Sequence, residues 1–365
     1  MPDIVYVYFD DTPSAASSVK DNLELTNRLI IDVKREEPWK DIISYLVDNQ
    51  TDYNGIILDW RLDSEPDSDA DFSTEALAQQ CRRLVSQNLN TKKFTKDFPM
   101  ILCSSQPDFA SLHEKDTTST DLFDVICTKN ELEDKGSFLI ALVEAYTKLN
   151  LEDRNACDIL GLTSSKAALI SQELIRKLDS IKNQNPHEII SFLQKEVLDK
   201  KGALINEDIL SARLGVNKNS EGWSNLLEKI SDAKYIGLLS CIDRWWGTLI
   251  DEWWEVNFEA DNLKYLAASE RILFLEAKYT ELVGKLNKLE LCEGSMNEEF
   301  WTVCYGSGAA LSELDGFAID QHLHYSWQER EYVCLNTAKN EDNIDKWKAL
   351  ISYENDRLEQ YFEEE

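Results

Sequence analysis

Four short apolar segments in the first 130 residues are each followed by polar side chains that are able to do chemistry. The polar residues are Asp10 and Asp11 after IVYVYF, Asp59 at the end of GIILD, Ser104 after PMILC, and Lys129 after VICT. Several carboxylates in one crevice repel one another and require a hard cation such as Mg²⁺. A carboxylate can also attack phosphorus, and a cation, a lysine and a hydroxyl would then stabilise the phosphoryl oxygens.

These residues have one common structural context, because apolar strands and helical segments alternate along residues 1–147. The expected strands are 4–9, 29–33, 55–58, 99–103 and 123–127, and the expected helices are 14–25, 39–47, 74–87 and 138–148. Such alternation predicts a doubly wound α/β domain with a parallel five-stranded, flavodoxin-like sheet. Ligands of these sheets bind at the carboxyl ends of the strands, so we expect the polar residues to meet at one edge.

The order and placement of these residues resemble the receiver domain of two-component response regulators, over roughly residues 1–148. The resemblance implies phosphotransfer to Asp59 from a histidine kinase or a phosphotransfer protein. It also implies that Lys129 pairs with the phosphoryl group and that Ser104 moves toward it as part of a switch.

The same resemblance implies a Mg²⁺ cofactor at this edge. Asp11 and Asp59 would hold the ion together with the backbone carbonyl of Arg61, and Asp10 would assist.

Several positions depart from the usual receiver pattern. Asn130 replaces a proline after the lysine, Ser105 replaces a small residue after the hydroxyl residue, and Ile126 replaces the switch aromatic. The glycine usual after the phosphoacceptor is absent, and residues 89–98 lengthen the segment between Asp59 and Ser104. These departures concern the aromatic-coupled switch, whereas the groups that the chemistry needs are retained.

Residues 149–365 do not resemble a known family, and they lack the regular alternation of strands and helices expected for residues 1–147. Helices are expected over 164–181, 188–198, 272–289 and 342–362, and strands over 300–305 and 317–327. We therefore predict a mostly helical output or interaction domain, with a small sheet if the last two segments form strands. Further boundaries are possible near 183–187 or 201–222.

Tryptophans are concentrated in the string RWWGTLIDEWW, with Trp245, Trp246, Trp253 and Trp254. An aromatic stripe at helical spacing commonly forms core, but tryptophan also anchors protein interfaces. The four residues are therefore candidates for partner binding.

A second pattern in this half is Asp320, His322 and His324, which would share the polar face of a strand. This spacing can ligate a metal, although an exposed polar face is the simpler interpretation. Cysteines 292, 304 and 334 are nearby in sequence but do not form a recognisable ligand motif.

Two segments, 156–174 and 207–230, faintly resemble helix-turn-helix units. Their second helices offer few basic or amide side chains for base edges, so helical packing units are the preferred interpretation.

Composition narrows the possible partners. The 365 residues include 38 basic and 68 acidic side chains, a formal charge of −30. This charge disfavours nucleic acid and anionic membrane as partners. No apolar run is long enough to span a bilayer, and the first residues are expected to be a strand rather than a signal peptide. Eight scattered cysteines without paired spacing are typical of a reducing cytoplasm.

The sequence therefore predicts a cytoplasmic response regulator that is not an enzyme, and whose second domain signals through protein contacts, with a homodimer as an option. Three alternatives stay open. One is a phosphate sink or adaptor, by analogy with receivers in phosphorelays and anti-phage defence operons. Another is a transcription factor with a degenerate helix-turn-helix. The last is a receiver-regulated enzyme, which a deep polar pocket near His322 and Trp253 would favour.

Overall fold

The computed structural model describes residues 3–35, 37–62, 72–86, 93–106, 121–151, 154–259, 262–340 and 344–363. The chain forms two compact units: Met1–Asn155 with Leu178–Leu193, and Ala156–Lys177 with Gln194–Glu365. The first segment of the first unit ends at Asn155, and residues 178–193 also belong to this unit. The domain boundary at 148 and the further boundaries near 183–187 or 201–222 stay predictions.

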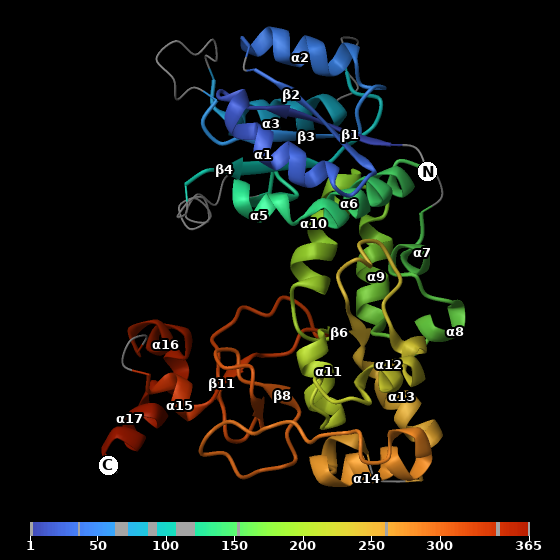
Figure 1. Ribbon diagram of the computed structural model, residues 1–365, viewed down its shortest axis with the longest axis vertical. Helices are drawn as coiled ribbons and strands as arrows, with labels where there is room; N and C mark the ends of the chain where they lie inside the picture. The colour runs from blue at the N-terminus through green and yellow to red at the C-terminus, as the bar shows by residue number, and fades with distance from the viewer. Residues whose placement is uncertain are drawn as a thin grey trace. The chain divides into compact units, whose positions relative to one another are not determined.

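A five-stranded parallel sheet forms the centre of the first unit (Figure 1). Its strands are β1 (Ile4–Phe9), β2 (Leu29–Lys34), β3 (Gly55–Asp59), β4 (Met100–Ser104) and β5 (Val125–Thr128). They are hydrogen-bonded in the order β2-β1-β3-β4-β5, and every pair is parallel. This is the strand order of the flavodoxin-like doubly wound fold, which confirms the predicted fold class.

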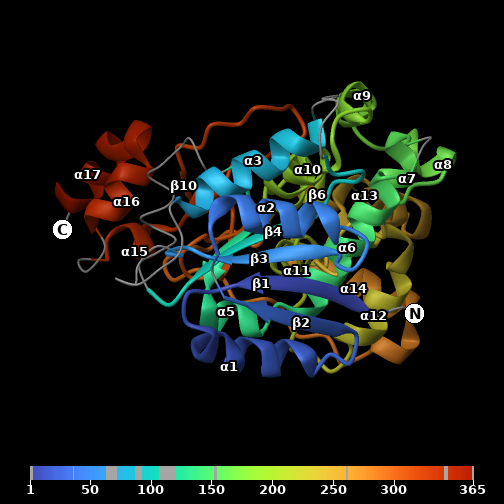
Figure 2. The same ribbon diagram turned by 90° about the horizontal axis from the view of Figure 1, so that it is seen from above.

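Helices cover both faces of this sheet. They are α1 (Pro13–Glu24), α2 (Trp39–Asp48), α3 (Thr74–Ser86), α5 (Lys129–Glu133), α6 (Gly136–Leu149) and α10 (Pro186–Phe192). In Figure 2 the strands lie between α2 and α3 on one side and α1 and α5 on the other. Val7, Ile56 and Leu102 belong to the core beneath α2 and α3. A hydrogen bond also ties β1 to α6, because the Tyr6 hydroxyl donates to the Leu139 carbonyl at 2.9 Å.

The second unit is mostly helical, as predicted. Its helices are α7 (Ala156–Leu160), α8 (Ser164–Ala167), α9 (Gln172–Ile181), α11 (Glu207–Leu214), α12 (Trp223–Lys229), α13 (Gly247–Asn257), α14 (Ala268–Lys278), α15 (Leu335–Ala338), α16 (Ile344–Leu350) and α17 (Asn355–Glu363). A π-helix covers Leu193–Leu198, and α9 ends within the first unit. Among the described helices, none combines the length and the apolar composition that crossing a bilayer requires.

Three antiparallel pairs of two-residue strands complete this unit. The pairs are β6 (Leu204–Ile205) with β7 (Trp245–Trp246), β8 (Thr302–Val303) with β9 (Ala310–Leu311), and β10 (Phe317–Ala318) with β11 (Tyr332–Val333). The predicted strands over 300–305 and 317–327 are thus present only as short β8 and β10. Most of their buried side chains are held by irregular backbone instead.

The predicted continuous helix over 272–289 is wrong beyond Lys278. Tyr279 adopts an extended conformation, a 3₁₀ turn covers Thr280–Leu282, and Gly284 has a φ of +71°. Leu282 and Leu286 are nevertheless buried. The helical spacing of apolar residues is therefore satisfied by a turn and a loop. The predicted helices over 164–181 and 342–362 are likewise divided, each into two helices.

Candidate functional site

The carboxyl ends of β1, β3, β4 and β5 lie at one edge of the first unit's sheet. Asp10 directly follows β1, and Asp59 is the last residue of β3, the strand paired with β1. The strand order reverses between these two strands, which is where doubly wound sheets bind ligands. Ser104 ends β4 beside Thr128, which ends β5. The residues identified from the sequence are thus brought to one edge.

Lys129 joins the two strand-end carboxylates. Its Nζ lies 2.6 Å from Asp10 Oδ2 and 2.8 Å from Asp59 Oδ1. Asp10 is fully buried, and Asp59 and Lys129 are 7% and 8% exposed. Because buried charges are costly unless paired, this bridge accounts for carboxylates at the ends of apolar strands.

The ammonium of Lys129, shared by two carboxylates, contributes to the pKa shifts of Asp59 and of Lys129 itself. Burial raises the pKa of Asp59, and the hydrogen bond from Lys129 lowers it only in part. Burial alone would lower the pKa of Lys129, but hydrogen bonds to Asp10 and Asp59 raise it overall. Lys129 is therefore held firmly in its charged form, whereas the charge of the Asp59 carboxylate is only partly compensated.

Backbone groups fix the remaining carboxylate oxygens. Thr12 N–H donates to Asp10 Oδ1 and Arg61 N–H donates to Asp59 Oδ2, both at 2.9 Å. The Thr74 hydroxyl at the start of α3 donates to the Asp59 carbonyl at 2.8 Å. Sequence reasoning missed Thr74, since a threonine at a helix start ordinarily reads as a cap. The Arg61 backbone lies at the site, and its role as a carbonyl ligand stays a prediction.

The donor set at this edge fits a magnesium ion. Asp10, Asp11 and Asp59 contribute three carboxylates and Lys129 one ammonium, which leaves a formal charge of −2 (−3 + 1). Asp11 is half-buried beside the fully buried Asp10. Carboxylate oxygens with access to water are the ligands that Mg²⁺ prefers. A bound Mg²⁺ would supply charge neutralisation at phosphoryl oxygens.

Ser104 and Ile126, the two residues at the positions that form the switch of receivers, have different surroundings. The Ser104 hydroxyl accepts a hydrogen bond from Gln106 N–H at 3.2 Å. Ile126, at the position where receivers have an aromatic, is half-buried and packs against the core beneath α2 and α3.

Lys129 begins α5, where Thr128 and Glu131 form a reciprocal capping box. The cap orients the helix that carries the lysine.

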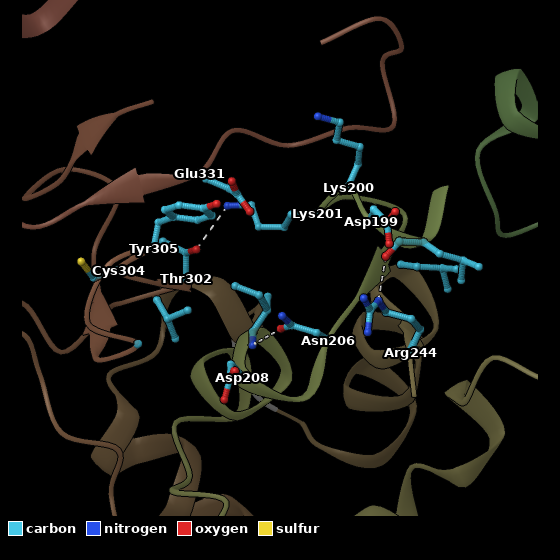
Figure 3. A pocket seen from close by; sticks show the side chains of 15 residues that line it. Asp199, Lys200, Lys201, Asn206, Asp208, Arg244, Thr302, Cys304, Tyr305 and Glu331 are labelled. Atoms are coloured by element: carbon cyan, nitrogen blue, oxygen red, sulfur yellow. Dashed lines mark hydrogen bonds between the residues drawn. The ribbon is translucent and has the colours of Figure 1, made fainter. Parts of the chain in front are cut away.

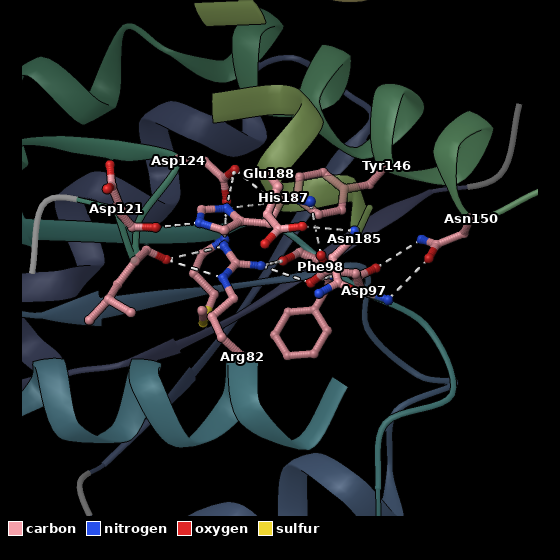
Figure 4. Close-up of polar contacts among 12 residues, drawn as sticks. Arg82, Asp97, Phe98, Asp121, Asp124, Tyr146, Asn150, Asn185, His187 and Glu188 are labelled. Carbon is pink, nitrogen blue, oxygen red and sulfur yellow. Dashed lines mark hydrogen bonds and ion pairs between the residues drawn. The ribbon is translucent and has the colours of Figure 1, made fainter. Parts of the chain in front are cut away.

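A buried polar network lies at the opposite, amino-terminal ends of β4 and β5 (Figure 4). Arg82 on α3 donates to Asp97 Oδ1 at 2.8 Å and to Asp124 Oδ2 at 3.0 Å. The Tyr146 hydroxyl donates to Asp124 Oδ1 at 2.7 Å. Burial would raise the pKa of Asp124, but Arg82 and His187 lower it to about 2.

His187 connects α10 to this network. Its backbone N–H donates to Asp97 Oδ2 at 2.9 Å, and its ring hydrogen-bonds the Asp121 carbonyl (Figure 4). Its Nδ1 lies 3.4 Å from Asp124 Oδ1. These contacts explain why residues 178–193 belong to the first unit. The sequence carried no signal for them, because each partner comes from a different element.

Three of the four candidate tryptophans are core residues. Trp245, Trp246 and Trp254 are 3%, 1% and 1% exposed. The prediction that these three residues bind a partner is therefore wrong, because the core of the unit covers their side chains. Trp254 stacks on Phe258 at a ring-centroid distance of 4.2 Å and meets Phe274 edge-to-face at 6.1 Å.

Trp253 is half-buried and lines a groove of about 290 Å³. Apolar neighbours in this groove include Leu169 and Leu249, and the exposed Val256 lies at the same site. Trp253 thus remains a candidate contact for another protein.

The predicted strand that would align Asp320, His322 and His324 ends at Ala318. The two histidine rings lie 4.4 Å apart edge-to-face, and Asp320 accepts a hydrogen bond from Ser352 at 2.8 Å. In the described part of the chain, no third His, Cys, Asp or Glu ligand joins the two rings. The metal-site interpretation of this pattern is therefore wrong.

The segments that resemble helix-turn-helix units are short packed helices. In the second of them, α12, Lys229 is paired with Glu281 at 2.7 Å. This acidic partner would compete with phosphate, so packing remains the preferred interpretation.

The alternative of a receiver-regulated enzyme would be favoured by a deep polar pocket near His322 and Trp253. The polar cavity of the second unit lies at other residues. A cavity of about 260 Å³ is lined by Lys201, Arg244 and Thr302, among others (Figure 3). Lys201 is buried, and its Nζ donates to the Thr302 hydroxyl at 3.2 Å. Burial lowers the pKa of Lys201.

Comparisons with known proteins find response regulators and their receiver domains among solved structures only. No protein-family model matches the chain, and no curated protein matches its sequence. Among solved structures, the signal receiver domain of the response regulator NarL from Mycobacterium tuberculosis is 12% identical, covers 40% of this chain and 98% of its own, and has a TM-score of 0.28. The response regulator RcsB of Salmonella typhimurium is 13% identical, covers 55% and 92%, and has a TM-score of 0.28. The phosphorylated cyanobacterial phytochrome response regulator RcpA is 14% identical, covers 41% and 95%, and has a TM-score of 0.24. The fold assignment itself rests on the strand order.

Proposed function

We propose that the chain is a response regulator whose Asp59 accepts a phosphoryl group from a histidine kinase or phosphotransfer protein. A carboxylate oxygen of Asp59 would form a bond to phosphorus while the phosphorus–nitrogen bond of the donor phosphohistidine breaks, leaving the electron pair on the imidazole. The observation that supports this most directly is the bridge of Lys129 to Asp10 and Asp59 at the switch point of the sheet.

Each group has a task in this reaction. Lys129 neutralises charge beside the attacked phosphorus, and Mg²⁺ held by Asp10, Asp11, Asp59 and the Arg61 carbonyl would neutralise the phosphoryl oxygens. The Ser104 hydroxyl would exchange its hydrogen bond with Gln106 N–H for one to the phosphoryl group. That exchange would release the backbone at Gln106 and couple phosphate to the surface near Ile126.

Signalling would proceed through protein contacts of the second unit rather than through catalysis. The groove beside Trp253 is the best-defined candidate contact there. The same proposal places the protein in the cytoplasm, and all eight cysteines are free thiols.

The test is incubation of the full chain with Mg²⁺ and acetyl phosphate, followed by intact-mass analysis. One acid-labile phosphate is expected in the wild type and in Asp52→Asn, a control at an exposed carboxylate outside the site. None is expected in Asp59→Asn. Persistence of the phosphate in Asp59→Asn would contradict the assignment.

Hydrogen exchange on the same phosphorylated sample distinguishes output from a phosphate sink. Protection changes in the second unit would support output through that unit. Changes confined to the first unit would instead favour a sink or adaptor.

A further inference from the structure

Three cysteines of the second unit come together at one buried point. The sulfurs of Cys292, Cys304 and Cys334 all lie within 4.8 Å of one another. The residues are 3%, 0% and 4% exposed. They come from three separate segments: a loop before β8, the residue after β8, and the residue between β11 and α15. Long-range folding, rather than a local motif, brings these sulfurs together.

Backbone hydrogen bonds fix the positions of the three residues. Cys292 N–H donates to the Ala310 carbonyl at 2.9 Å, and Cys304 N–H donates to the Ala309 carbonyl at 2.8 Å. Cys334 N–H donates directly to Cys304 Sγ at 3.3 Å. The backbone of each cysteine is therefore held by a hydrogen bond, and one of these bonds is accepted by the sulfur of Cys304.

Polar groups around the sulfurs are suited to a negatively charged cluster. The Thr337 hydroxyl lies 3.4 Å from Cys304 Sγ and 3.2 Å from Cys334 Sγ. With the Cys334 N–H, it provides hydrogen-bond donors of the kind that orient and stabilise thiolate ligands.

The spacing and chemistry favour a zinc ion. A tetrahedral zinc with Zn–S bonds of about 2.3 Å holds its sulfurs about 3.8 Å apart, which is compatible with this cluster. Sulfur ligands select soft or borderline metals and disfavour Mg²⁺ and Ca²⁺. We propose that Cys292, Cys304 and Cys334 bind one zinc ion through three thiolates.

A fourth ligand can enter from a neighbouring cavity. A space of about 180 Å³ is lined by Cys292 and Cys334 and also by Arg357. Three thiolates and Zn²⁺ would leave a charge of −1, and the Arg357 guanidinium on this cavity is itself paired with Glu354 at 2.7 Å. Water or a small anionic ligand from this cavity completes the tetrahedron.

Zinc at this point would stabilise the C-terminal part of the chain. The three cysteines belong to the same core as Trp347 of α16, Ile351 directly after α16, and Leu358 of α17. In Figure 1 these helices lie together with α15, directly after β11. Zinc binding releases the thiol protons, so the affinity falls as the pH falls.

The test uses Co²⁺ as a spectroscopic probe of the full, tag-free, reduced chain. One thiolate-bound Co²⁺ per chain is expected, measured from the saturation of the thiolate charge-transfer absorption, which Zn²⁺ abolishes by displacement. Cys304→Ser should lose this absorption, whereas Cys241→Ser, at an exposed thiol, and His322→Gln should keep it. Thr337→Val should weaken Zn²⁺ binding about tenfold or more.

Hydrogen exchange of the wild type with and without Zn²⁺ keeps the test independent of variant folding. Peptides containing the three cysteines should gain protection on zinc addition. Absence of Co²⁺ absorption in the wild type, or its persistence in Cys304→Ser, would overturn the proposal.

Discussion

Replacing Lys129 with methionine tests whether the lysine holds the strand-end carboxylates in place. The substitution keeps a long side chain but removes the ammonium that lies 2.6 Å from Asp10 and 2.8 Å from Asp59. Removing one partner of a buried ion pair costs about 3–5 kcal/mol. Because two buried carboxylates lose their partner here, we expect a loss of unfolding free energy in that range at pH 7.

The matched control is Lys20→Met, at a lysine whose contact with Glu24 is 3.8 Å long and whose side chain is 39% exposed. Exposed helical pairs contribute only about 0.3–0.5 kcal/mol. Hydrogen exchange at increasing urea, on peptides from β1 and β3, gives the unfolding free energy without a contribution from the second unit.

Magnesium should partly restore Lys129→Met, because the divalent ion replaces the missing charge. At 100 times its Kd, Mg²⁺ adds about 2.7 kcal/mol. The gain should be larger in the variant than in the wild type, where Lys129 competes for the same carboxylates. Equal small losses for Lys129→Met and Lys20→Met, or no recovery with Mg²⁺, would refute this account.

Further predictions concern the supporting structure. The pKa of Asp124 is lowered from 3.8 to about 2, so its ionised form stabilises the fold above pH 3.8 and this stabilisation is lost as the pH falls through 2. Over that pH range, the free energy of unfolding of the wild type should fall by about 2 kcal/mol more than that of Asp124→Asn. Thr128→Ala should destabilise α5 by about 1 kcal/mol, seen as faster amide exchange in that helix, and unchanged exchange would exclude a role for the cap. Trp254→Ala should lower the stability of the second unit in urea by about 3–5 kcal/mol and Trp253→Ala by clearly less, whereas equal losses would place both in the core.

The first unit could be predicted because its signals are local and repeated. Each strand is a short apolar run, and the strand-end position of Asp59 and Lys129 follows from the chain order alone. Parallel sheets bring those ends together whatever the details of the loops. The role of His187 could not be predicted, because it depends on α10 packing beside strands more than sixty residues earlier in the chain.

In the second unit, the same apolar spacing fits more than one backbone. Leu282 and Leu286 continue the helical period of α14, yet the chain turns after Lys278 and buries them from a 3₁₀ turn and a loop. Phe317 and Ile319 alternate as in a strand, although only Phe317–Ala318 pairs as one. Periodicity identified which side chains are buried but not the backbone that buries them. The cluster of Cys292, Cys304 and Cys334 has no regular spacing because three distant segments build it.

The central claim is that Asp59 carries the phosphoryl group. Borohydride reduces an aspartyl phosphate to homoserine and leaves free carboxylates intact, so peptide mapping after reduction identifies the acceptor. In the chain treated with acetyl phosphate and Mg²⁺, we predict homoserine at residue 59 alone. Homoserine at Asp10 or Asp11, or an unmodified Asp59 in a chain that has gained phosphate, would contradict the account.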